Sequence, residues 1–129
     1  MSEMINLAFG DTAVAVRREL SLPEDPVRQG QLRAKLEEYR KRLQVANLSA
    51  HREASTNYKV WVLQQLLDRH TLSFELMRSA VAAESSTPTL SLAYLAYAWK
   101  VIENYCYHGG AYNRGGTGLD RKSTRLNSS

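Results

Sequence analysis

Cysteine, proline and long apolar runs are all scarce in this chain of 129 residues. The single cysteine, Cys106, excludes an internal disulfide and a zinc site built from several thiolates, so we expect it to be a small buried residue. No apolar run approaches the roughly 20 residues that span a bilayer. The first residues lack a basic stretch followed by an apolar one, which predicts an intracellular protein without a secretion signal or a membrane partner.

The composition is that of an ordinary globular domain. Hydrophobic residues make up 43% and charged residues 23% of the chain, and the length suits a single core. Residues 120–129 read DRKSTRLNSS, which resembles the translation of a sequencing-library adapter and contributes half of the formal charge of +4. We therefore expect one domain over residues 1–119 and a non-native tail after it.

Two helices are predicted in the first half of the chain. Residues 3–20 place Ile5, Phe9, Val16 and Leu20 close to one helical face, although Gly10-Asp11 interrupts the pattern. Residues 27–48 repeat apolar side chains at steps of three and four, with Asp25 as the cap and Pro26 in the first turn. The opposite face of this second helix is charged and is interpreted as solvated.

Two further helices are predicted in the second half. The segment 58–83 has helical spacing, and a short strand at its contiguous β-prone residues 60–63 is the alternative. Residues 89–107 follow the linker Glu84–Thr89, and their broad apolar face includes Trp99 and Cys106. Four helices with short connections predict an all-α fold, an antiparallel four-helix bundle with up-down-up-down order.

No constellation for catalysis or cofactor binding stands out. His108 lies two positions after Cys106, and two positions on a helix point about 200° apart. The histidines have no metal-binding spacing, and the glycine-rich segment 109–119 lacks the ending of a phosphate-binding loop. We predict a protein that is not an enzyme and has no catalytic residue, metal or cofactor.

Aromatic residues go almost all the way round the predicted last helix. Core packing accounts for Trp99 and Tyr105, whereas Tyr94 and Tyr97 are expected to face outward and to form a contact with another protein. One hypothesis is a subunit interface between copies of this chain. The alternative is a small intracellular helical adaptor or regulator that binds a different protein through this aromatic surface.

Three short motifs resemble the coat proteins of rod-shaped plant RNA viruses, the tobacco-mosaic type. Met4-Ile5-Asn6-Leu7 is similar to the family's Leu-Ile-Asn-Leu, and Tyr58-Lys59-Val60 to its Phe-Lys-Val. Gly110-Ala111-Tyr112-Asn113-Arg114 is similar to Gly-Ser-Tyr-Asn-Arg. The resemblance implies a four-helix bundle that assembles helically around single-stranded RNA, found in the virion and the host cytoplasm.

The resemblance also implies which residues meet RNA. Gln31-Leu32-Arg33 is similar to the family's Gln-Ala-Arg, so Arg33 is expected to contact phosphate, and Arg78 and Arg114 are further candidates. Tyr112 joins Tyr94 and Tyr97 as a candidate for the subunit interface. The family's arginines and aspartates near the last helix are missing here, so the carboxylate pair that helps such rods disassemble has no assigned position. Glu75, Glu84 and Glu103 are candidates for it, and each is interpreted instead as a solvated surface acid.

Overall fold

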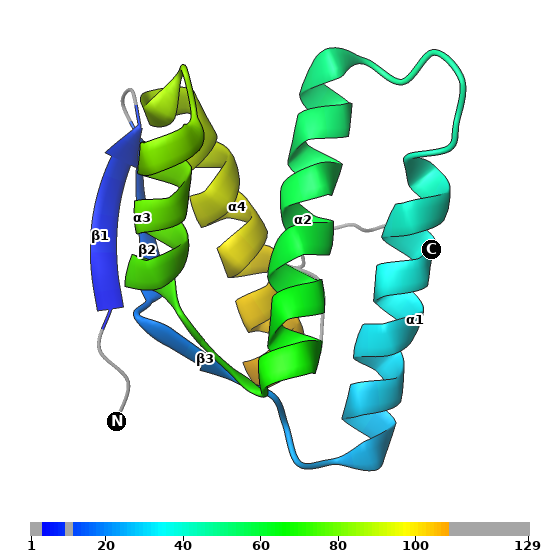
Figure 1. Ribbon diagram of the computed structural model, residues 1–129. Helices are drawn as coiled ribbons and strands as arrows, with labels where there is room; N and C mark the ends of the chain where they lie inside the picture. Colours follow the sequence, from blue (N-terminus) through cyan, green and yellow to red (C-terminus); the bar gives the residue numbers. More distant parts are fainter. Residues whose placement is uncertain (1–3, 10–11, 109–129) are drawn as a thin grey trace, which may run out of the picture.

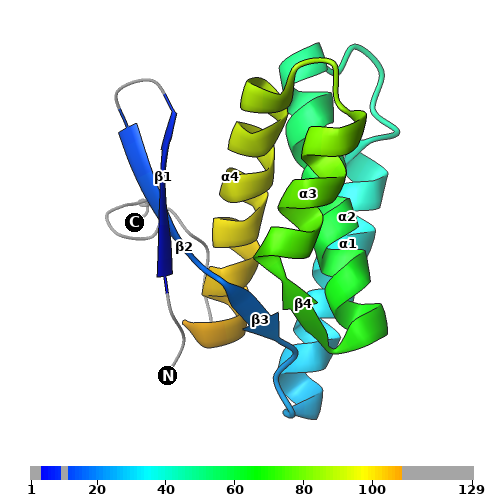
Figure 2. The ribbon, with the colours of Figure 1, turned by 60° about the vertical axis from the view of Figure 1, so that its left-hand side comes forward.

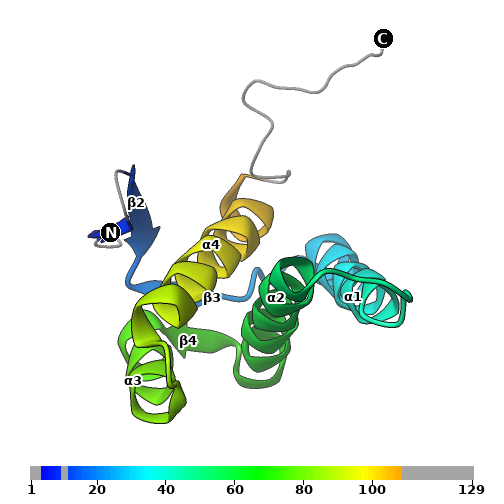
Figure 3. The same cartoon turned by 90° about the horizontal axis from the view of Figure 1, so that it is seen from above.

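Helices and strands both contribute to the fold of this protein. The structure is a computed structural model that describes residues 4–9 and 12–108. In chain order the elements are β1 (Met4–Phe9), β2 (Thr12–Arg17), β3 (Glu19–Ser21), α1 (Pro26–Arg42), α2 (Ala50–Arg69), β4 (Thr71–Ser73), α3 (Phe74–Glu84) and α4 (Pro88–Tyr107). The helices stand in the order α1, α2, α4, α3; α1 runs opposite to α2 and α3 runs opposite to α4, whereas the central neighbours α2 and α4 run in the same direction (Figure 1, Figure 3). The prediction of an all-α four-helix bundle is wrong, because the described residues form a mixed fold with two small antiparallel sheets.

The first predicted helix is a β-hairpin. β1 pairs antiparallel with β2, with Ile5 opposite Val16 and Leu7 opposite Val14. Apolar residues at every second position suit a strand with one face on the core, and Val16 is fully buried there. Figure 2 shows this hairpin beside α4. The apolar residues that recur at every second position on either side of Gly10-Asp11 therefore indicated two strands correctly, whereas the helical spacing in the same segment was misleading.

The predicted helix over residues 58–83 is two helices joined by a strand. α2 ends at Arg69, and the next residue, His70, has a φ of 71°, the left-handed conformation that often terminates helices. β4 then pairs antiparallel with β3, which places Leu72 opposite Leu20 with both side chains buried. Ser73 caps α3 by accepting a hydrogen bond from the backbone N–H of Leu76 at 3.4 Å. The strand lies at residues 71–73, outside the β-prone run 60–63.

Capping side chains set the starts of α1 and α2. The prediction for α1 is confirmed: Asp25 accepts a hydrogen bond from the N–H of Val27 at 3.0 Å, and Pro26 occupies the first turn. Ser49 caps α2 by accepting from the N–H of Arg52 at 3.1 Å. α2 therefore begins well before the predicted start at residue 58, and residues 50–57, which lie between the predicted helices 27–48 and 58–83, are helical.

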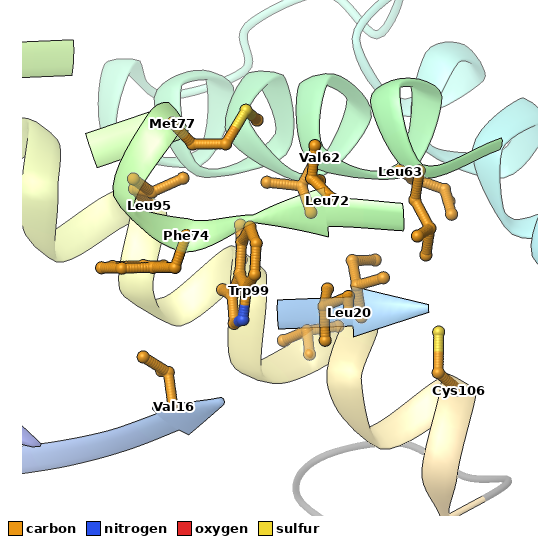
Figure 4. Close-up of a cluster of buried hydrophobic side chains, with 14 of the residues drawn as sticks. Val16, Leu20, Val62, Leu63, Leu72, Phe74, Met77, Leu95, Trp99 and Cys106 are labelled. Carbon is orange, nitrogen blue, oxygen red and sulfur yellow. The ribbon is translucent and has the colours of Figure 1, made fainter. Parts of the chain in front are cut away.

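The core gathers around α4. Trp99 is fully buried and meets the ring of Phe74 edge to face, with the centroids 5.1 Å apart and the planes at 85° (Figure 4). Its indole N–H donates to the carbonyl of Arg17 at 2.8 Å, so the largest apolar side chain has its polar atom satisfied. Cys106 is buried in the same cluster, as predicted. The predicted helix over residues 89–107 corresponds closely to α4.

A buried carboxylate fastens the hairpin to α4. Glu103 is only 2% exposed, and its Oε1 accepts from the backbone N–H of Arg17 at 3.1 Å. Its Oε2 accepts from Lys100 Nζ at 3.0 Å and lies 3.8 Å from Arg17 Nε. The interpretation of Glu103 as a solvated surface acid is therefore wrong. Buried carboxylates need such partners, which explains why an acid is tolerated next to Trp99.

Candidate nucleic-acid interface

A row of four aromatic rings runs along the junction of α2 and α4. His51 Nδ1 and the hydroxyl of Tyr94 are hydrogen-bonded at 2.7 Å. Tyr94 stacks on Tyr58 with the planes at 15° and the centroids 6.0 Å apart, and Tyr58 meets Trp61 at 71° with the same separation. None of the four side chains is fully buried. Such rings offer apolar faces and fixed orientations to a flat ligand.

A basic groove lies beside this row. It has a volume of about 500 Å³ and is lined by Arg42 from the last turn of α1, by the first half of α2 and by the first half of α4. We use the name basic groove for its lining residues, which are Arg42, His51, Arg52, Ser55, Thr56, Lys59, Leu90, Ala93, Tyr94 and Tyr97. Among the residues that the structure describes, the lining contains no aspartate or glutamate. An anion in the groove would therefore meet cations and hydroxyl groups, which are good partners for phosphate.

Lys59 is the most perturbed cation of the groove. Burial lowers its pKa from the ordinary value of 10.5, and the positive charges of Arg42, Arg52 and Lys35 lower it further. Within residues 4–9 and 12–108, its ammonium group makes no ion pair; it lies 5.0 Å from the ring centroid of Tyr97 and 5.6 Å from that of Tyr39. A bound anion would relieve this repulsion, because an opposite charge favours the protonated amine.

The helix ends reinforce the positive potential. His51 and Arg52 lie in the first turn of α2, and Leu90 lies in the first turn of α4. Helix N-termini carry partial positive charge, so two of the three helices present their favourable ends to an anion. Arg42 belongs to the C-terminal end of α1, and it also pairs with Glu38 at 3.1 Å. The strongest unneutralised charges are therefore those of Arg52 and Lys59.

The two tyrosines predicted for an interface lie in the groove. Tyr97 is 44% exposed and Leu90 is 53% exposed, and both project from the same face of α4. Tyr94 is half-buried because Tyr58 and His51 cover part of its ring. The third predicted interface residue, Tyr112, lies outside the described residues.

The arginines predicted to contact RNA do not converge. Arg33 lies on α1 and lines a different cavity, in which Glu37 and Asp68 are also present. Arg78 lies on α3 at the other end of the row of helices and pairs with Glu75 at 2.8 Å (Figure 3). Arg114 lies outside the described residues. On a single copy of the chain, Arg33 and Arg78 therefore cannot contact the same short stretch of RNA.

The cations of the basic groove were missed for a specific reason. Arg42 belongs to the charged face of the predicted helix 27–48, which had been interpreted as solvated, and residues 49–57 lay between the two predicted helices. Once α2 begins at Ala50, His51, Ser55 and Lys59 are four residues apart and share one face. The signal that could have revealed them was Ser49 as a helix cap.

Other reactive side chains are poorly placed for chemistry. Burial raises the pKa of the Cys106 thiol to about 12, so little thiolate, the nucleophilic form, is present at neutral pH. Among the described residues, no group of three or more histidine, cysteine, aspartate or glutamate side chains could hold a metal ion. Within the same ranges, no helix is both long and apolar enough to cross a membrane.

Comparison of the chain with protein-family models, with curated proteins and with solved structures finds no match.

Proposed function

We propose that this protein binds single-stranded RNA through the basic groove and assembles around it as a viral coat protein. The observation that carries the proposal is the groove itself, with Arg42, Arg52 and Lys59 beside aromatic rings and no acid among the described lining residues. Proteins that bind single strands combine cations for the backbone with aromatic platforms for the bases. The groove offers both within one cavity.

The chemistry favours a single strand over a duplex. Stacking on a protein side chain requires an unpaired base, and Tyr97 supplies a ring that is 44% exposed. The Nζ of Lys59 lies 5.0 Å from the centre of that ring, so a phosphate on the ammonium group and a base on the tyrosine are about one nucleotide apart. The binding would be largely independent of sequence, because every base has a face to stack.

The resemblance to rod-shaped virus coat proteins supports the assembly part of the proposal. One matched motif, Tyr58-Lys59-Val60, places its lysine in the basic groove and its tyrosine in the aromatic row. Another, Met4-Ile5-Asn6-Leu7, lies in β1 instead of a helix. In this proposal the protein acts by binding and has no catalytic role.

Assembly with RNA is the test of the whole proposal. The purified protein would be mixed with a long single-stranded RNA and observed by electron microscopy and analytical sedimentation. Discs or rods that form more readily with RNA are expected. A strictly monomeric species at high protein concentration, with and without RNA, would refute it.

A second candidate is an adaptor that binds another protein through the exposed apolar groups of α4. The exposure of Leu90 and Tyr97 on one helix face favours it, since such side chains often become buried in a protein interface. Salt separates the two candidates. RNA binding weakens steeply as the ionic strength rises, whereas an apolar interface responds little.

A further inference from the structure

A second cavity, opposite in charge to the basic groove, lies between α2 and α3. Its volume is about 550 Å³, and the described residues that line it include one acid and no lysine, arginine or histidine. We use the name acidic pocket for its lining residues, which are Asn57, Tyr58, Trp61, Ala80, Val81, Glu84, Ser85 and Ser86. It lies where the first half of α2 and the end of α3 flank α4 (Figure 1, Figure 3).

The wall of the acidic pocket on α2 is an aromatic corner. The rings of Tyr58 and Trp61 meet at 71°, with their centroids 6.0 Å apart. Tyr58 is held from behind by its stack on Tyr94, which itself lines the basic groove. Two nearly perpendicular rings allow one positive group to approach both within about 6 Å, the range of a cation–π interaction.

The wall on α3 supplies an unneutralised carboxylate. Glu84 is the last residue of α3, is exposed, and forms no ion pair or hydrogen bond within residues 4–9 and 12–108. Its charge attracts cations and repels phosphates. At the end of a helix the negative pole of the helix dipole adds to the same preference.

We propose that the acidic pocket binds a small organic cation, an alkylammonium group such as the trimethylammonium head of choline. The aromatic corner favours methylated ammonium groups, which need little hydration, and Glu84 compensates their charge. A purely apolar ligand would leave the carboxylate unpaired, and an anion would be repelled by it. This site is separate from the basic groove and does not depend on the proposed binding of RNA.

Tryptophan fluorescence gives a direct measurement. The chain has two tryptophans, and Trp99 is fully buried while Trp61 is half-buried at the acidic pocket. The full-length protein would be titrated with choline and, separately, with 3,3-dimethyl-1-butanol, a neutral molecule of the same shape. Choline is expected to change the emission at a concentration at least about tenfold lower than the alcohol. Trp61→Phe should abolish the response and leave the emission of Trp99.

Variants of acidic residues on α3 isolate the role of charge. Glu84→Gln should weaken choline binding about fivefold to tenfold without changing the response to the alcohol, because only the attraction to the cation is lost. Glu75→Gln is the matched control, since Glu75 lies on the same helix outside the pocket and is paired with Arg78. Circular dichroism would verify that each variant is folded. Equal responses to choline and the alcohol, or unchanged choline affinity in Glu84→Gln, would overturn the proposal.

Discussion

Replacing Lys59 by glutamine is the sharpest perturbation of the proposed RNA interface. Among the described residues that line the basic groove, the lysine and arginine side chains are Arg42, Arg52 and Lys59. If each contacts one phosphate, the logarithm of the association constant should fall with the logarithm of the salt concentration with a slope of about −2, because each contact to a single strand contributes about −0.7. Lys59→Gln should reduce the magnitude of the slope to about 1.4 and weaken binding about fivefold at 0.1 M salt.

The same substitution should not destabilise the protein. Burial and neighbouring positive charges lower the pKa of Lys59, which means that its environment disfavours the charged form. A neutral glutamine removes that penalty, so the thermal midpoint of Lys59→Gln should equal or exceed that of the original protein. Unaltered or higher stability with weaker RNA binding is typical of a residue that is present for its ligand.

Fluorescence anisotropy of a labelled oligouridine, measured between 0.05 and about 0.4 M salt, provides the assay. Lys59→Arg should preserve the slope, because the charge is retained. Arg69→Gln is the matched control at the other end of α2, where the arginine is hydrogen-bonded to Gln65 outside the groove. The reasoning is refuted if Lys59→Gln keeps the original slope, or if Arg69→Gln reduces it equally.

Three further predictions concern the fold and the interface. Glu103→Ala should reduce the free energy of unfolding by about 3 kcal/mol in a urea titration, because it removes the buried partner of Arg17 and Lys100. A reduction below about 1 kcal/mol would contradict the role assigned to this carboxylate. The stability of the folded protein should fall as the pH rises from 9 toward 12, since the pKa of Cys106 is raised from 9.0 to about 12 and the unfolded chain loses that proton first. Thermal melts of Cys106→Ala should show a weaker dependence on pH. An identical pH profile in this variant would exclude the thiol as the source of the dependence. Tyr94→Ala combined with Tyr97→Ala should weaken self-association measured by sedimentation, and normal assembly would remove these tyrosines from the interface.

Local patterns predicted α4 and the start of α1 well. The apolar face of α4 is continuous and long, and Asp25-Pro26 is a strong start signal, so each element could be predicted from its own residues. The pairing between distant segments could not be predicted in this way. β4 has three residues and exists because Leu72 lies opposite Leu20, a contact that no local window of the sequence contains. The hairpin was open to prediction from its alternating pattern, and the helical spacing was wrongly preferred.

The candidate site was predicted only in part, for the same reason. Tyr94 and Tyr97 were identified as outward-facing residues of one helix. Their cationic neighbours come from α1 and α2, and only the packing of three helices brings Arg42, Arg52 and Lys59 to them. Glu103 was misassigned because a buried acid depends on partners from β2 and from the preceding turn of its own helix.

Ultraviolet crosslinking of the protein to an oligouridine, followed by mass spectrometry of the peptides, tests the central claim most directly. If the basic groove binds single-stranded RNA, adducts should concentrate in residues 51–59 and 90–97, and excess salt should suppress them. Adducts centred on Arg33 or Arg78, or no salt-sensitive adducts at all, would contradict the account.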